Sequence, residues 1–143
     1  MNAWSLGAAA VAALSAAASA EAVREVMIPA QRIAWKVEAP RQPQRLGALW
    51  GVRSTGPAGT LLKVPGGFVA PVHTHTADYR AVVIEGVWKH WPDGAGKDNV
   101  LALRPGSYWT QKARIWHADS CISKTPCTIL LINTEPYRTV LKR

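Results

Sequence analysis

An all-β fold, a sandwich or barrel of antiparallel strands, is the fold class that this 143-residue sequence predicts. Short runs of β-branched and aromatic residues recur along the chain, and glycine or proline interrupts them at regular spacing. The sequence shows no internal repeat and no amphipathic pattern of three helical turns. Its length suits one compact domain, which we expect to span residues 21–143.

The first twenty residues differ from the rest of the chain. They carry no charged side chain, are rich in alanine and end in the small-x-small pattern Ala18-Ser19-Ala20. A signal peptidase accepts such an end after an apolar run, so we interpret residues 1–20 as a signal peptide. We therefore expect a periplasmic or secreted protein that has no stable membrane insertion after cleavage. Because no Lys or Arg precedes the apolar run, a retained membrane anchor is the alternative.

The strands that we expect follow one another between turn signals such as Gly56-Pro57, Pro65-Gly66-Gly67, Pro92-Asp93-Gly94 and Pro105-Gly106. They are IAWKVE (33–38), LGALWGVR (46–53), TLLKVP (60–65), HTH (73–75), YRAVVIEGVW (79–88), VLALRPGSYW (100–109), ARIWHADSC (113–121) and CTILLIN (127–133). Residues 39–45 form a polar connector that contains proline, and the last residues, 137–143, are expected to add an edge strand.

The chain is basic, with a formal net charge of +8. Its Lys and Arg residues are scattered from Arg24 to Arg143, and no basic run or nucleic-acid motif is present. We therefore expect no nucleic-acid partner. The charge instead favours a small-molecule ligand that is anionic.

Two cysteines, Cys121 and Cys127, flank the turn-like segment ISKTP. A hairpin between two apolar strands would bring them opposite each other. In an oxidising compartment the pair would form a disulfide, whereas in the cytosol it would be two free thiols. The sequence leaves both outcomes open.

Two histidines, His73 and His75, are one residue apart in a predicted strand. Side chains alternate across a strand, so both imidazoles point to the same face and can chelate one metal ion. The spacing around them is Gly67-x5-His73-x-His75-x3-Tyr79-x6-Gly86. A second spacing, Gly106-x5-Lys112-x-Arg114-x2-His117-x3-Cys121, follows later in the chain.

These two spacings, in this order, resemble the two motifs of the cupin superfamily, G-x5-H-x-H-x3-E-x6-G and G-x5-P-x-G-x2-H-x3-N. The resemblance covers roughly residues 46–135. Tyr79 stands where the first motif has glutamate, and of the second motif only the glycine and the histidine are kept. LGALWGVR, HTHTADYR and RPGSYWTQ further resemble a family of small, often exported cupins of unassigned function, in which a tyrosine also follows the histidine pair.

The resemblance implies a cupin jelly-roll barrel in which His73, His75 and His117 converge on one metal ion. Three neutral imidazoles suit Fe, Zn, Cu or Ni, whereas Mg and Ca prefer oxygen ligands. The missing glutamate leaves the charge of such a metal uncompensated. Some cupin dioxygenases nevertheless work with three histidines and iron.

Two further residues are candidates for catalysis. Tyr79 lies on the interior face by strand parity, and its phenol could bind the metal, donate a hydrogen bond or exchange a proton. A tyrosine that only packs in the core is the alternative. Arg114 could bind a carboxylate or phosphate at the mouth of the barrel, and an exposed turn cation beside Lys112 is the alternative.

The remaining polar candidates are weaker. Asp78 alternates to the wrong face and is expected in a turn, whereas Glu85 lies on the face of Tyr79 unless a β-bulge intervenes. His90, in the loop-like context KHWPDG, is expected to be exposed. Trp109 and Trp116 could form walls of the pocket.

Two classes of function fit the sequence. The first is a metal-dependent enzyme acting on a small organic molecule, with a three-histidine iron dioxygenase as its most specific form. The second is a protein that binds a metal or a small ligand without turnover. The resemblance to cupins also implies a homodimer.

Overall fold

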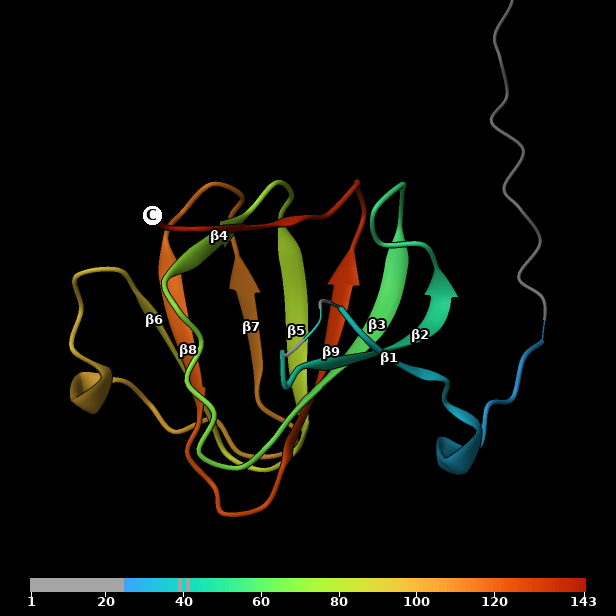
Figure 1. The fold of residues 1–143 in the computed structure, drawn as a ribbon, viewed down its shortest axis with the longest axis horizontal. Helices are drawn as coiled ribbons and strands as arrows, with labels where there is room; N and C mark the ends of the chain where they lie inside the picture. The colour runs from blue at the N-terminus through green and yellow to red at the C-terminus, as the bar shows by residue number, and fades with distance from the viewer. Residues whose placement is uncertain (1–24, 39, 41) are drawn as a thin grey trace, which may run out of the picture.

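The strands of this protein form two antiparallel sheets, which together make an open barrel (Figure 1). The structure is a computed structural model that describes residues 25–38, 40 and 42–143. The predicted signal peptide, residues 1–20, lies outside the described residues. Within the described part only two 3-10 turns, η1 (Ala30–Arg32) and η2 (Lys97–Asn99), accompany the strands, and no helix there is long and apolar enough to cross a membrane.

The two sheets differ in size. The six-stranded sheet has the order β1 (Trp35–Val37), β2 (Arg45–Gly51), β3 (Ala58–Val64), β9 (Cys127–Asn133), β5 (Tyr79–Glu85) and β7 (Tyr108–Gln111). The four-stranded sheet has the order β10 (Thr139–Leu141), β4 (His73–His75), β8 (His117–Cys121) and β6 (Trp88–Pro92). The all-β prediction is confirmed, and the C-terminal residues do form an edge strand, β10.

The centre of the larger sheet explains why it is stable. In β5 the residues Tyr79, Ala81 and Val83 are buried while Arg80 between them is exposed, as alternation across a strand requires. The neighbouring strand β9 packs Ile129 at 1% exposure in the same core. Fully burying a side chain of this size stabilises the fold by about 1.5–3 kcal/mol. The core therefore lies on the inner face of this sheet.

Several of the predicted strands are shorter or divided in the structure. The run 79–88 divides at Gly86, whose φ of 81° ends β5 and sends the chain into β6 of the other sheet. In the run 100–109, only the end from Tyr108 is a strand, and the run 113–121 becomes a strand at His117.

Glu85 is not a buried carboxylate. The register of β5 against β9 shifts between Val83 and Glu85, so the parity that the sequence suggests is lost at this bulge. The side chain of Glu85 is exposed and accepts a hydrogen bond from the hydroxyl of Thr128 at 3.1 Å.

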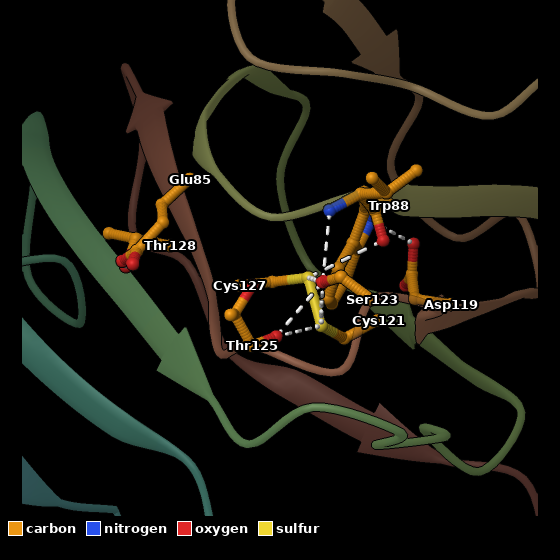
Figure 2. Close-up of a disulfide and its surroundings, with 9 residues drawn as sticks. Glu85, Trp88, Asp119, Cys121, Ser123, Thr125, Cys127 and Thr128 are labelled. Carbon is orange, nitrogen blue, oxygen red and sulfur yellow. Dashed lines mark hydrogen bonds between the residues drawn. A yellow bond between two sulfur atoms is a disulfide. The ribbon is translucent and has the colours of Figure 1, made fainter.

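Cys121 and Cys127 form a disulfide, with their Cα atoms 5.8 Å apart (Figure 2). The expected hairpin is wrong, however, because β8 pairs with β4 and β6, whereas β9 pairs with β3 and β5. The disulfide therefore joins the end of β8, in the four-stranded sheet, to the start of β9, in the six-stranded sheet. Both cysteines are almost completely buried, and Ser123 in the intervening turn contacts both sulfur atoms.

Candidate metal centre

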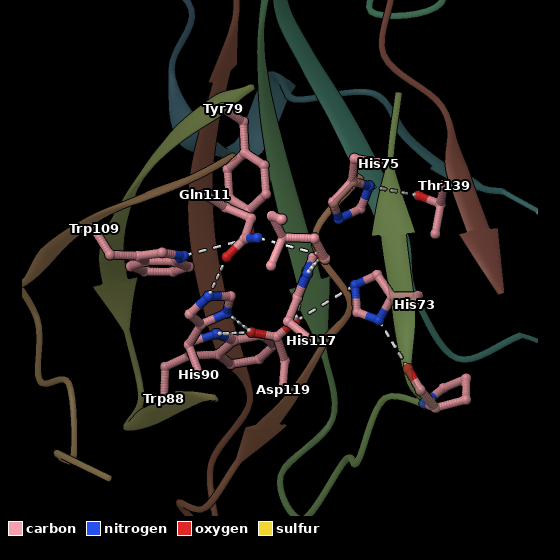
Figure 3. A network of polar contacts seen from close by, with 12 residues as sticks. His73, His75, Tyr79, Trp88, His90, Trp109, Gln111, His117, Asp119 and Thr139 are labelled. Carbon is pink, nitrogen blue, oxygen red and sulfur yellow. Dashed lines mark hydrogen bonds and ion pairs between the residues drawn. The ribbon is translucent and has the colours of Figure 1, made fainter. Parts of the chain in front are cut away.

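Three histidines from two strands of the smaller sheet meet inside the barrel (Figure 3). His73 and His75 share one face of β4, and His73 lies opposite His117 in the β4–β8 register. One ring nitrogen from each lies within 4.8 Å of the other two. The structure thus brings together the three ligands that the sequence predicts.

Hydrogen bonds at Nδ1 leave the Nε2 atoms of the histidines in position to bind a metal ion. The Nδ1 atom of His73 donates to the carbonyl of Pro71 at 2.8 Å, and that of His117 donates to the carbonyl of Ile115 at 2.9 Å. His75 Nδ1 lies 3.4 Å from the hydroxyl of Thr139. Carbonyl partners fix the ring and the tautomer of metal-binding histidines, so that Nε2 of His73 and of His117 carries the free lone pair.

The Nε2 atom of His117 is the clearest sign that a ligand belongs here. It is buried and has no hydrogen-bond partner within the described part of the chain. Leaving such an atom unsatisfied costs about 1–3 kcal/mol, which a bound metal ion would recover. The donor set of three imidazoles therefore fits a divalent transition metal.

The electrostatic environment keeps two of the imidazoles neutral, which is the form that binds metal. Burial, together with the neighbouring His73, His117 and Arg53, lowers the pKa of His75 from 6.5 to about 2. Burial also lowers the pKa of His117, although the nearby carboxylate of Asp119 opposes this effect. A metal ion therefore meets little competition from protons at these two rings.

A buried carboxylate, Asp119, lies beside the triad. It follows His117 by two residues on β8 and is 5% exposed. Its Oδ2 atom lies 3.5 Å from His73 Nε2 and 3.7 Å from His117 Nε2. Its Oδ1 atom accepts hydrogen bonds from His90 Nδ1 at 2.7 Å and from Trp88 Nε1 at 3.1 Å.

His90 is not the exposed loop residue that its context suggests. It belongs to β6, its side chain is 13% exposed, and its ring lies 4.9 Å from the ring of His117. Burial alone would lower the pKa of His90, but the hydrogen bond and charge of Asp119 and the contact with Gln111 raise it. Burial likewise would raise the pKa of Asp119, yet His90 and the other histidines lower it. Each residue of this buried, hydrogen-bonded pair therefore favours the charged form of the other.

Tyr79 does point into the barrel, as strand parity predicts. Its ring lies edge-on to His75, with centroids 5.2 Å apart, and its hydroxyl accepts a hydrogen bond from Trp109 Nε1 at 3.4 Å. Burial, with the charge of Asp119 and the proximity of Tyr137, raises the pKa of Tyr79 well above 10. In the metal-free protein its phenol therefore keeps its proton at neutral pH.

A cavity of about 530 Å³ opens beside the histidines. Apolar side chains from both sheets, including Leu62, Phe68 and Ile129, form much of its wall. Trp109 also lines it, as expected, whereas Trp116 is not among the lining residues. Cavities of this size hold small organic molecules.

Arg114 lies outside this cavity, on the exposed turn between β7 and β8. Its φ of 62° explains why the second cupin motif has glycine at this position. The backbone N–H of Arg114 donates to the carbonyl of His75 at 2.9 Å and so ties this turn to β4. Asp78 lies in the connection between β4 and β5, as expected, and is exposed; its carboxylate accepts hydrogen bonds from the backbone of Ala113 and from the side chain of Lys112.

The cation that does line the cavity is Arg53, which no motif or spacing in the sequence singles out. Its side chain is 15% exposed, and its guanidinium lies 4.6 Å from the ring centre of Tyr137. The ring of Tyr137 in turn stacks on His75 with a centroid distance of 4.4 Å. The ring of Tyr137 therefore separates the guanidinium of Arg53 from His75.

Of the residues that the sequence analysis overlooked, one had a usable signal. Asp119 follows His117 with the same i, i+2 spacing that placed His73 and His75 on one face, so parity alone could have found it. His90 was hidden by the turn signal that follows it, and Arg53 has no local pattern at all.

Comparison with known proteins agrees with this geometry. Residues 25–131 match a family described as a domain of unknown function (DUF4437). The chain belongs to this family. No curated protein matches the sequence.

Among solved structures, the fold is similar to several cupins. An RmlC-like cupin from Ralstonia eutropha shares 19% identity, with a TM-score of 0.62, over 79% of this chain and 70% of that one. The polyketide cyclase RemF from Streptomyces resistomycificus shares 16% identity, with a TM-score of 0.65, over 84% and 88% of the chains. KdgF from Halomonas sp. shares 15% identity, with a TM-score of 0.60, over 77% and 95%. The jelly-roll fold of the cupin superfamily is thereby confirmed.

Proposed function

We propose that this chain is an exported, metal-dependent enzyme that binds one divalent transition-metal ion at His73, His75 and His117 and acts on a small organic molecule. The observation that carries the proposal is the buried, unpartnered Nε2 of His117, in a cluster of three imidazoles beside a cavity of about 530 Å³. Fe, Zn, Cu and Ni are the metals that suit this donor set.

The cavity supports a substrate that is mostly apolar and carries one anionic group. Leucine, isoleucine, phenylalanine and tryptophan side chains form its walls, and Arg53 is the guanidinium that lines it. Arg53 has a single acidic contact, at 3.5 Å from the half-exposed Glu38, within the described part of the chain. A planar guanidinium of this kind binds a carboxylate with two parallel hydrogen bonds.

The residues around the cavity suit a reaction that moves protons. A metal ion, when bound, supplies Lewis-acid polarisation of a substrate oxygen. Tyr79, whose phenol keeps its proton, lines the same cavity and can donate that proton or a hydrogen bond to an oxygen of the substrate. Arg53 and Tyr137 would orient the anionic end. Similar folds support this class, since they include a lyase acting on DMSP and a polyketide cyclase.

An iron dioxygenase is the second candidate. The three-histidine set of the first and second motifs, without the glutamate of the first motif, is the observation that favours it, because some cupin dioxygenases have three histidine ligands. Binding without turnover is the outcome that would exclude both enzyme classes.

Metal content tests the site first. Wild-type protein purified without chelator or added metal should contain close to one transition-metal ion per chain by elemental analysis. The variant His117→Ala, checked for folding by circular dichroism, should lose most of it. Stoichiometric metal in that variant would show that the site is assigned to the wrong residues.

Turnover separates the classes. Protein loaded with zinc or with iron(II) is mixed with small keto, diketo and hydroxy carboxylates, and products are followed by NMR while oxygen consumption is recorded. Turnover with zinc supports proton-transfer chemistry, whereas oxygen consumption that requires iron supports a dioxygenase. For the anionic group, Arg53→Met should weaken binding of a carboxylate probe such as benzoate at least about tenfold. The exposed Arg80→Met is the matched control and should change nothing.

A further inference from the structure

A buried carboxylate lies beside the proposed metal site, although not at the position where the cupin motif places it. Tyr79 occupies the glutamate position of the first motif, and its hydroxyl is engaged by the indole of Trp109. Among the described residues, Asp119 is the acidic residue whose carboxylate lies against the histidine triad.

The two oxygens of Asp119 have different surroundings. Oδ1 is held by two donors, the imidazole of His90 and the indole of Trp88. Among the residues that the structure describes, none donates a hydrogen bond to Oδ2, which instead faces the Nε2 atoms of His73 and His117, at 3.5 and 3.7 Å. These are the same nitrogens that hydrogen bonding at Nδ1 leaves free to bind a metal ion.

The distances fit a shared ion better than a hydrogen bond. Ligand atoms that bind one transition-metal ion at about 2.0–2.2 Å are separated from one another by roughly 3–3.5 Å. A charge-assisted hydrogen bond between nitrogen and a carboxylate would be about 2.7–2.9 Å long. Oδ2 is thus near the spacing of a ligand that shares an ion with His73 and His117, and it is too far for a strong hydrogen bond to either imidazole.

We propose that Asp119 is the fourth protein ligand of the metal, so that the carboxylate of the cupin site has moved from the glutamate position of the first motif to the second residue after the second-motif histidine. This inference rests on the proposed metal site and adds a ligand to it. A carboxylate in this shell offsets one charge of a divalent ion, which three histidines alone leave uncompensated.

His90 acts as a positioning residue for Asp119, because both of its ring nitrogens are already engaged. Its Nε2 lies 2.8 Å from the amide oxygen of Gln111. The amide nitrogen of Gln111 donates to the carbonyls of Lys112 and Ile115, so the oxygen is the atom that faces His90. His90 therefore donates from both nitrogens and has no lone pair to offer. A metal site made of His90, His117 and Asp119 would therefore require one of these hydrogen bonds to break and the freed nitrogen to lose its proton.

Cobalt(II) binding tests the assignment in four proteins: wild type, Asp119→Asn, His90→Gln and the surface control Asp98→Asn. Affinity is measured by competition with a chelator, and the visible spectrum of the bound cobalt reports the ligand set. Residues that only support a ligand typically change metal affinity by about 10–100-fold. Affinity alone therefore cannot separate a ligand from a positioning residue, and the spectrum is the deciding measurement.

We expect Asp119→Asn to weaken cobalt binding by at least about 100-fold and to change the position and intensity of the visible bands. His90→Gln should weaken binding about tenfold and leave the bands in place, and Asp98→Asn should match wild type. An unchanged spectrum in Asp119→Asn overturns the proposal, whatever the affinity. Wild-type protein that binds no cobalt refutes the proposed metal site itself, which is a different result.

If Asp119→Asn does not fold, wild-type protein gives the answer. The chain has four aspartates, Asp78, Asp93, Asp98 and Asp119, so protein labelled with ¹³C at the aspartate carboxyl gives four signals. Asn variants of the three other aspartates assign the Asp119 signal by elimination. This signal should move as one equivalent of zinc is added. A signal that stays at its metal-free position overturns the proposal.

Discussion

Acidifying the metal-free protein from about pH 7.5 to about pH 5 should weaken its fold by about 2 kcal/mol through His75 alone. The pKa of this imidazole falls from 6.5 to about 2 in the folded protein, chiefly because it is buried. Below pH 6.5 the unfolded chain therefore takes up a proton at His75 that the folded protein does not. The stability that His75 contributes is fully present above pH 6.5, its pKa in the unfolded chain, and is lost progressively as the pH falls towards about 2, its pKa in the folded protein.

The magnitude follows from the protons bound in each state. At about pH 5 the unfolded state gains RT ln(1 + 10^1.5), about 2 kcal/mol, whereas at about pH 7.5 it gains less than about 0.1 kcal/mol. The folded state gains almost nothing at either pH, because both lie far above a pKa of about 2. His90, whose pKa is raised, acts in the opposite direction, so the contribution of His75 must be isolated by mutation.

Urea unfolding in the presence of a chelator, at both pH values, measures this contribution. The variant His75→Gln keeps a polar side chain of similar size that does not titrate. Wild type should lose about 2 kcal/mol more than the variant between the two pH values. If wild type and variant lose the same free energy of unfolding, His75 is already accessible to protons in the folded protein, and its burial does not keep it neutral.

Three other predictions concern single features. Tyr79→Phe should change the free energy of unfolding by less than about 1 kcal/mol but should alter metal affinity or reactivity; a variant identical to wild type in affinity, visible spectrum and activity would make Tyr79 a packing residue. Arg114→Gly should stabilise the protein by about 0.5–1 kcal/mol in thermal unfolding, since its φ of 62° favours glycine, and a loss of activity would instead support its predicted catalytic role. Replacing Cys121 and Cys127 by serine should lower the free energy of unfolding by about 2 kcal/mol, because the disulfide closes a short loop. A urea midpoint equal to that of wild type would contradict this.

Export, the homodimer and the anionic ligand stay predictions. They depend on residues 1–20, on a second copy of the chain and on a bound molecule, respectively. The native metal likewise follows from the donor set only as a choice among Fe, Zn, Cu and Ni.

The histidine triad could be predicted because its information is local. The spacing of His73 and His75 determines that they share a face of one strand, and the second motif identifies His117 without any knowledge of how the strands pair. The close pair of cysteines was likewise visible, although the sequence left open whether the two are bridged and could not tell a hairpin from the corner between two sheets that the structure contains.

The rest of the site was decided by tertiary structure. His90 reaches Asp119 because β6 pairs with β8, and Glu85 turns outward because a bulge shifts the register of β5 against β9. Arg53 reaches the cavity from the turn after β2, where its backbone carbonyl accepts the N–H of Tyr137 from the far end of the chain. Alternation along a strand says which side chains share a face. Which faces meet across the barrel depends on pairings between distant segments, and no local pattern in this sequence records them.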